Sequence, residues 1–149
     1  MQARIVQDMK VPLLGARVAR NFIIIEPDPI VAMDVEGILK DHFPAAHVSS
    51  GKSLSDVRHV VHVCGAGSTL FVRATLLLED DHVKRVMRDA VAKQAQIVII
   101  GTHFDVGFPA FFIDMPFTTE MLLDAVAHNG SVSQDGSVAQ DGQTVIKIS

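Results

Sequence analysis

The residues of this sequence that could do chemistry are few, and most of them follow apolar segments. Glu26 and Asp28 come directly after the apolar run 21–25, and Asp80 follows a second apolar stretch. Carboxylates that converge on one point can hold a divalent cation. Thr102 follows another apolar run, so a small ligand could bind near Glu26 and Thr102 if these runs are parallel strands.

The remaining reactive residues do not form a recognisable site. His59 and His62 are three residues apart with no evident third ligand, which favours surface histidines over a metal centre. Cys64 lies among apolar residues and is expected to be a buried, inert thiol. The segment 65–67 resembles the start of a dinucleotide-binding loop, but Leu70 stands where the third glycine is needed. No nucleophile elbow or catalytic triad is spaced along the chain, so we expect no enzyme activity.

Composition excludes several classes of function. The 149 residues are 48% hydrophobic and 20% charged, with a formal net charge of -4, which does not favour binding to nucleic acid. No apolar run is long enough to span a bilayer, and charges and Pro12 interrupt the N-terminal segment, so we expect neither a membrane span nor a signal peptide. A single cysteine fits a reducing compartment, and we expect a cytoplasmic protein.

Apolar runs and helical periodicities alternate along the chain, which predicts an α/β protein with a doubly wound, five-stranded parallel sheet. The runs without alternation are typical of strands that are buried on both faces. Strands are expected at 21–25, 46–49, 70–78, 97–100 and 111–113, and helices at 30–43, 53–64, 79–94 and 120–128. Asp28 is expected to cap the first helix, with Pro29 at its first position, and Thr118 or Thr119 is expected to cap the last one.

Three parts of the chain differ in composition. Residues 1–20 carry a local charge of +3 and are expected to be an N-terminal extension, and residues 21–129 form the predicted domain. Residues 130–149 contain a six-residue near-repeat and end in the β-prone segment 144–148. We expect this tail to form a flexible appendage, a hairpin or an edge strand.

Three segments carry a resemblance to a known family. Residues 22–29, 97–102 and 110–118 resemble the first, fourth and last strands of a response-regulator receiver domain, with the residues that follow them. The resemblance covers about residues 21 to 128 and implies the flavodoxin-like receiver fold. It also implies a cis peptide bond between Met115 and Pro116.

Receiver domains suggest a specific chemistry. Two acids after the first strand and an aspartate at the end of the third hold Mg²⁺, and that aspartate accepts a phosphoryl group. A lysine before the last proline neutralises the phosphoryl oxygens, and a threonine or serine after the fourth strand reports their arrival. These are the roles that the resemblance assigns, and each can be compared with this sequence.

This sequence departs from the receiver pattern at three of those places. Pro27 replaces the second acid, Met115 replaces the lysine, and the acceptor position falls near Ala74, with Arg73 beside it. We interpret the pocket as vestigial and expect it to hold neither metal nor cofactor. Its residues are Glu26, Asp28, Ala74, Thr102, Met115 and Pro116. The predicted function is a non-phosphorylatable receiver-like module in bacterial two-component signalling, acting on unidentified signalling proteins, with a homodimer as an open alternative.

The fourth helix of a receiver does not fit this chain. Only eight residues, 103–110, separate Thr102 from the last strand, and a helix with two loops needs roughly twice as many. We therefore expect this helix to be reduced or missing. The apolar side chains of this region then have two interpretations: they form an exposed patch for a partner or pack onto the sheet as core. They are Phe104, Val106, Phe108 and Phe111.

Two other functions stay open at this point. A phosphorylatable response regulator could use displaced acids, namely Glu26, Asp28 and Asp80, although Asp80 is also placed to cap the next helix. A flavodoxin-like domain could instead bind a small ligand at the carboxyl ends of its strands, near Glu26 and Thr102.

Overall fold

A computed structural model of the chain describes residues 20–135, with side chains up to residue 127. The predicted N-terminal extension up to residue 19 and the segment from residue 136 onward, with the predicted strand at 144–148, lie outside the described residues. None of the helices within residues 20–135 is long and apolar enough to cross a membrane.

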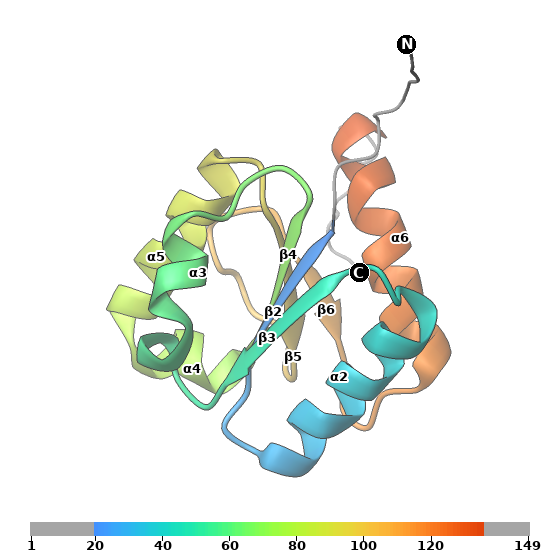
Figure 1. The fold of residues 1–149 in the computed structure, drawn as a ribbon. Coiled ribbons are helices and arrows are strands. Elements are labelled where there is room, and N and C mark those ends of the chain that lie inside the picture. The colour runs from blue at the N-terminus through green and yellow to red at the C-terminus, as the bar shows by residue number, and fades with distance from the viewer. Residues whose placement is uncertain (1–19, 136–149) are drawn as a thin grey trace, which may run out of the picture.

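Five parallel strands form one sheet in the order β3-β2-β4-β5-β6, which confirms the predicted doubly wound architecture (Figure 1). The short β3 lies at one edge, as expected. The three central strands are almost completely buried because helices cover both faces of the sheet. The strands are β2 (Asn21–Ile25), β3 (His47–Gly51), β4 (Ser68–Arg73), β5 (Gln96–Ile100) and β6 (Phe111–Ile113).

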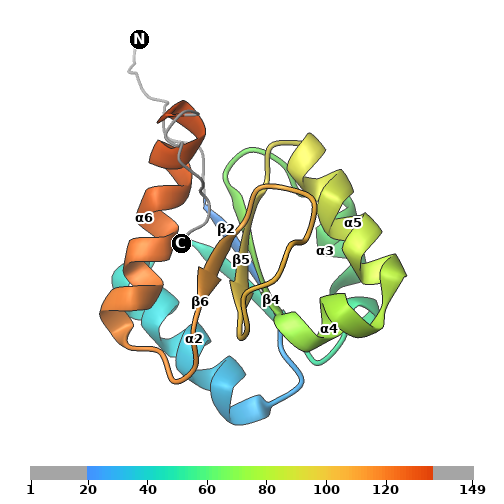
Figure 2. The same ribbon diagram turned by 180° about the vertical axis from the view of Figure 1, so that it is seen from behind.

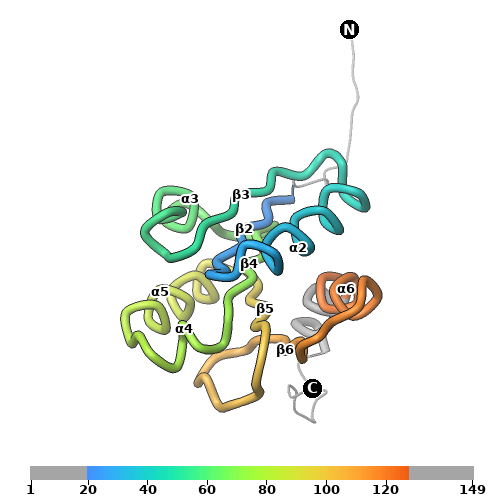
Figure 3. The backbone as a smooth tube through the Cα atoms, turned by 90° about the horizontal axis from the view of Figure 1, so that it is seen from below, coloured from blue at the N-terminus to red at the C-terminus, as the bar shows by residue number. Residues whose placement is uncertain are grey.

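The helices form two layers on opposite faces of the sheet, as the end-on and rear views show (Figures 2 and 3). One layer contains α2 (Pro29–His42) and α6 (Thr119–Asp135). The other contains η2 (Leu54–Val57), α3 (Arg58–His62), α4 (Ala74–Glu79) and α5 (Asp81–Ala92). The resulting three-layer arrangement leaves the carboxyl ends of all five strands at one edge of the sheet.

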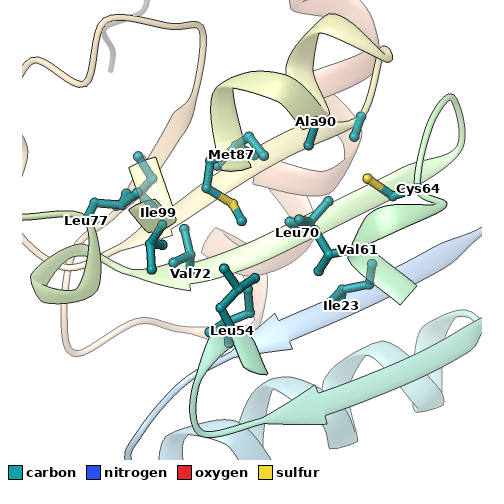
Figure 4. Close-up of a cluster of buried hydrophobic side chains, with 14 of the residues drawn as sticks. Ile23, Leu54, Val61, Cys64, Leu70, Val72, Leu77, Met87, Ala90 and Ile99 are labelled. Carbon is teal, nitrogen blue, oxygen red and sulfur yellow. The ribbon is translucent and has the colours of Figure 1, made fainter. Parts of the chain in front are cut away.

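Each face of the sheet has its own hydrophobic core. On the α3–α5 face, alternate residues of the central strands, such as Leu70 and Ile99, pack against Val61, Leu77 and Met87 (Figure 4). On the other face, strand residues of opposite parity pack against α2 and against Leu122 of α6, and the largest of them are Phe22, Ile24, Phe71 and Ile100. The alternation of side chains along a strand therefore divides every apolar run between the two cores.

Local signals at the helix ends were predicted correctly. Asp28 caps α2 by accepting a hydrogen bond from the Ile30 N–H at 2.9 Å, and Pro29 occupies the first helical position. Thr118 caps α6 by accepting from the Met121 N–H at 3.1 Å. Asp80 accepts from the His82 N–H at 2.9 Å, so this acid caps α5.

The third predicted strand is too long, and the prediction beyond residue 73 is wrong. Residues 70–72 are β-prone or aliphatic and residues 76–78 are aliphatic, but β4 ends at Arg73 and α4 begins at once with Ala74. Within α4 the buried residues are Ala74 and Leu77, three apart, which is helical spacing. Ala74, the leucines at 76–78 and Glu79 are also good helix formers, so helix propensity and burial against the sheet agree in this segment.

The last helix is longer than predicted. It continues beyond residue 128 to Asp135, so the first copy of the near-repeat is mostly helical and residue 129 lies inside α6. By contrast, the missing fourth helix is confirmed, because residues 101–110 contain no helix between β5 and β6.

Candidate functional site

The carboxyl edge of the sheet holds a buried ion pair between two strand ends. Glu26 follows β2 and is 2% exposed, and its Oε1 accepts a hydrogen bond from Arg73 Nε at 2.9 Å. Its Oε2 accepts from Arg73 Nη2 at 3.0 Å. This two-point contact is the strongest geometry available to a carboxylate and a guanidinium.

Strand register brings these two side chains together. Ile25 of β2 lies opposite Val72 of β4, so the next residue of each strand, Glu26 and Arg73, are neighbours. Glu26 directly follows β2 and Arg73 is the last residue of β4, and because these strands are parallel, both side chains reach the same edge. Arg73 keeps 22% of its side chain exposed, so the pair lies at the boundary between the core and water.

Asp28 completes the local network. Its backbone N–H donates to Glu26 Oε2 at 2.8 Å, while its own carboxylate is engaged in capping α2. Both carboxylate oxygens of Glu26 thus accept hydrogen bonds, and the buried charge is compensated by Arg73 and by the backbone.

Small residues close the neighbouring part of the edge. Ala74 is buried at the start of α4, and Gly101 follows β5 with φ of 128°. A Cβ at Gly101 would lie 3.1 Å from the Ala74 Cβ, so the two backbones approach closely here. No functional side chain comes from Ala74 or Gly101, the residues that directly follow the ends of these two strands.

The other predicted pocket residues are more exposed. Thr102 lies on the surface just after Gly101, and Met115 is 40% exposed. The bond between Met115 and Pro116 is cis, as the resemblance implied. Of the acids proposed for the alternative site, Asp28 and Asp80 both cap helices. Among the side chains that the structure describes, no three His, Cys, Asp or Glu residues are grouped so that they could hold a metal ion.

The predicted apolar patch after β5 packs onto the sheet. Val106 is 5% exposed, so the structure favours the core interpretation over an interaction surface for this residue. Phe104 and Phe108 are half-buried against the α3–α5 core, and Phe111 is half-buried against the other core. The T-shaped contact of Phe104 with Phe112, at 6.0 Å between ring centroids, belongs to this packing. These rings cover the sheet where a fourth helix is missing.

The most exposed large apolar side chains lie elsewhere. Ile30 and Met33 of α2 are 69% and 70% exposed. The buried residues of α2 are instead Val31, Ala32, Val35 and Leu39. Val63 and Leu78 are also exposed.

Cys64 is buried at the end of α3, as predicted. Burial raises the pKa of its thiol above 9.0, and the nearby Lys93 ammonium partly opposes that effect. A thiol with a raised pKa is protonated at neutral pH and is a poor nucleophile.

Arg73 is the functional residue that sequence reasoning did not place. The sequence carries a signal for it, because opposite charges follow two buried runs that must lie in the same parallel sheet. The predicted strand 70–78 hid that signal, since it moved the strand end away from Arg73. Correct register makes Arg73 the partner of Glu26.

Comparison with known proteins identifies the fold. The structure superposes on a response regulator from Thermotoga maritima with a TM-score of 0.58 and 15% identity, over 76% of this chain and 99% of that chain. A chemotaxis protein from Vibrio cholerae gives a TM-score of 0.60 and 14% identity, over 75% and 99% of the two chains. The fold is that of a response-regulator receiver domain.

The other comparisons give the same fold or no match. A response regulator receiver protein from Sinorhizobium medicae shares the receiver fold with a TM-score of 0.58 and 22% identity, over 74% of this chain and 93% of that chain. No protein-family model matches the sequence, and the search of curated proteins gives no significant match. At these identities the likeness concerns the fold, and the function has to be argued from the site.

Proposed function

We propose that this protein is a receiver-like signalling module that acts through protein–protein contact and does not accept a phosphoryl group. The Glu26–Arg73 ion pair carries this proposal. A receiver needs a free carboxylate at the end of its third strand, and the corresponding strand here, β4, ends in Arg73 and is followed by Ala74.

The charges around the pair oppose phosphoryl transfer. Glu26 is the only carboxylate in the Glu26–Arg73–Asp28 network whose side chain faces Arg73, and both its oxygens already accept hydrogen bonds. A nucleophilic carboxylate needs a free oxygen lone pair aimed at phosphorus. Glu26 would have to break its contacts with Arg73 and lose its counter-charge before it could attack.

The surface supports a role in contact with another protein. Ile30 and Met33 lie three residues apart on α2 and expose most of their apolar area to water. Burial of such side chains against another protein is favourable, by about 25 cal/mol per Å² of apolar surface. The partners we propose are signalling proteins, with self-association as the alternative, and the proposed location is the cytoplasm.

Intact-mass measurement tests the absence of phosphorylation. The full chain is incubated with acetyl phosphate and Mg²⁺ and then weighed, with a phosphorylatable receiver as the positive control. We expect no gain in mass. A stoichiometric gain of one phosphoryl group would refute the proposal, and its loss in Asp80→Asn or Asp28→Asn would identify a displaced acceptor.

Solution measurements test the interaction. Light scattering of the full chain gives its mass in solution, and a dimer that dissociates in Ile30→Ser/Met33→Ser would identify the partner as a second copy. A monomer that binds a signalling protein, and loses this binding in Ile30→Ser/Met33→Ser, would support a signalling protein as the partner. If the protein is a monomer and binds none of the signalling proteins tested, the result would argue against an interaction module.

A further inference from the structure

The receiver fold implies a divalent cation at the carboxyl edge, and the residues of this chain do not fit one. Mg²⁺ needs near-octahedral oxygen coordination, and proteins usually supply it through one or two carboxylates with water. Here both oxygens of Glu26 accept hydrogen bonds from Arg73 and the Asp28 N–H. Pro27 offers no side-chain ligand, and the Asp28 carboxylate accepts from the Ile30 N–H.

We propose that Arg73 is the resident cation of this edge, taking the electrostatic place that a divalent ion has in other receivers. This inference rests on the proposed function and explains how the carboxyl edge of the sheet keeps one charge state without a metal ion. The guanidinium is attached to the end of β4 and directed at the Glu26 carboxylate, with nitrogen–oxygen distances of 2.9 and 3.0 Å. The positive charge is therefore present without any ion from solution.

Two physical properties suit arginine to this role. A guanidinium stays charged in proteins and matches a carboxylate with two parallel N–H groups. The Glu26 side chain is 1% exposed, so its ionised form requires a counter-charge at close range. Arg73 provides that charge and also joins the ends of β2 and β4, the strands that carry the two side chains.

A fixed cation has a consequence for the behaviour of the protein. A divalent ion would meet the positive charge of Arg73 at the carboxylate it needs, and it would have to displace two hydrogen bonds. We therefore expect the conformation of this edge to be independent of divalent cations. Exchanging the positive side chain for a carboxylate should reverse this behaviour, because two adjacent acids repel each other until a cation binds.

The test compares the full-length protein with Arg73→Asp, which places a second carboxylate beside Glu26. Melting temperatures are measured in EDTA and in about 10 mM MgCl₂ or about 1 mM MnCl₂, where a bound ion raises Tm by mass action. Arg85→Asp is the matched control, because it makes the same charge change at an exposed position of α5.

We expect the wild type and Arg85→Asp to shift by less than about 1 °C on addition of metal, and Arg73→Asp to gain about 3 °C or more with saturation. A comparable gain in the wild type would overturn the inference. Failure of a folded Arg73→Asp to gain more than the control would overturn it as well.

A second variant keeps the test decisive if Arg73→Asp does not fold. Arg73→Asn removes the charge and leaves an amide oxygen, and calorimetric titration with Mn²⁺ should show at least about tenfold tighter binding than the wild type. Equal affinities would refute the role of Arg73. Metal binding by the wild type without a phosphoryl gain would overturn this inference alone, whereas a phosphoryl gain in the intact-mass experiment would overturn the proposed function.

Discussion

The ion pair between Glu26 and Arg73 makes a quantitative prediction about stability. In Arg73→Met the apolar stem of the side chain is kept, but the guanidinium and its two hydrogen bonds to Glu26 are lost. The Glu26 carboxylate, whose side chain is 1% exposed, keeps the hydrogen bond from the Asp28 N–H. The variant therefore leaves a buried negative charge without its counter-charge.

The size of the effect follows from burial. Removing one partner of a fully buried ion pair costs about 3–5 kcal/mol, and the 22% exposure of Arg73 lets water reach the site, so we expect about 2–4 kcal/mol. Adding Glu26→Gln removes the stranded charge, and the amide oxygen can still accept from the Asp28 N–H. The double variant should therefore lose less than the sum of the single variants, by about 2 kcal/mol.

Urea unfolding followed by circular dichroism measures all four proteins, since the chain has no Trp or Tyr for fluorescence. The control is Lys40→Met, which breaks the Lys40–Glu36 ion pair, with 2.7 Å between Nζ and Oε2 and side chains 60% and 31% exposed. That variant should lose less than about 0.5 kcal/mol. A coupling energy below about 0.5 kcal/mol between Glu26 and Arg73 would refute this reasoning.

Three further predictions concern the fold. Gly101→Ala should lower the free energy of unfolding by about 1–3 kcal/mol, because φ at Gly101 is 128° and the added Cβ would lie 3.1 Å from the Ala74 Cβ in α4. Gly37→Ala should raise it by about 0.5–1 kcal/mol, because nothing lies within 4 Å of a Cβ at that helical position. Urea unfolding of both variants tests this, and equal effects would contradict it. Met87→Ala should lower the free energy of unfolding by about 2–5 kcal/mol, because the Met87 side chain is buried. Met33→Ala should lower it by less than about 0.5 kcal/mol, because Met33 is 70% exposed. Burial raises the pKa of the Cys64 thiol above its ordinary value of 9.0, so the unfolded chain releases this proton at a lower pH than the folded chain. Stability should therefore fall as the pH rises through the range in which only the unfolded chain is deprotonated. The urea midpoint should decline between about pH 8 and about pH 10 in the wild type, and less in Cys64→Ala.

Much of the fold follows from local patterns. Apolar runs without alternation predicted the three central strands, because strands buried on both faces have no polar side to show in the sequence. Asp28 and Thr118 were recognised as caps because their side chains need only the first turn of the helix that follows. The short interval at 103–110 excluded a fourth helix by chain length alone.

Other features were set by tertiary contacts. The end of β4 at Arg73 is one of them: the aliphatic residues after it were predicted as strand, but they form α4, in which Ala74 and Leu77 bury their side chains. The exposure of Ile30 and Met33 is likewise set by tertiary packing, because apolar spacing alone does not reveal which side of a helix meets the core.

The sequence by itself determined the alternation of elements, the caps of α2 and α6, and the presence of Pro27 and Met115 where the receiver pattern has an acid and a lysine, because these depend on neighbouring residues or on identity alone. Only the tertiary structure decided that Glu26 pairs with Arg73. Their contact spans 47 positions in the sequence and depends on the register of β2 against β4, which no local pattern encodes. Only when the end of β4 is placed at Arg73 does this arginine become the charge that neutralises the buried Glu26 carboxylate.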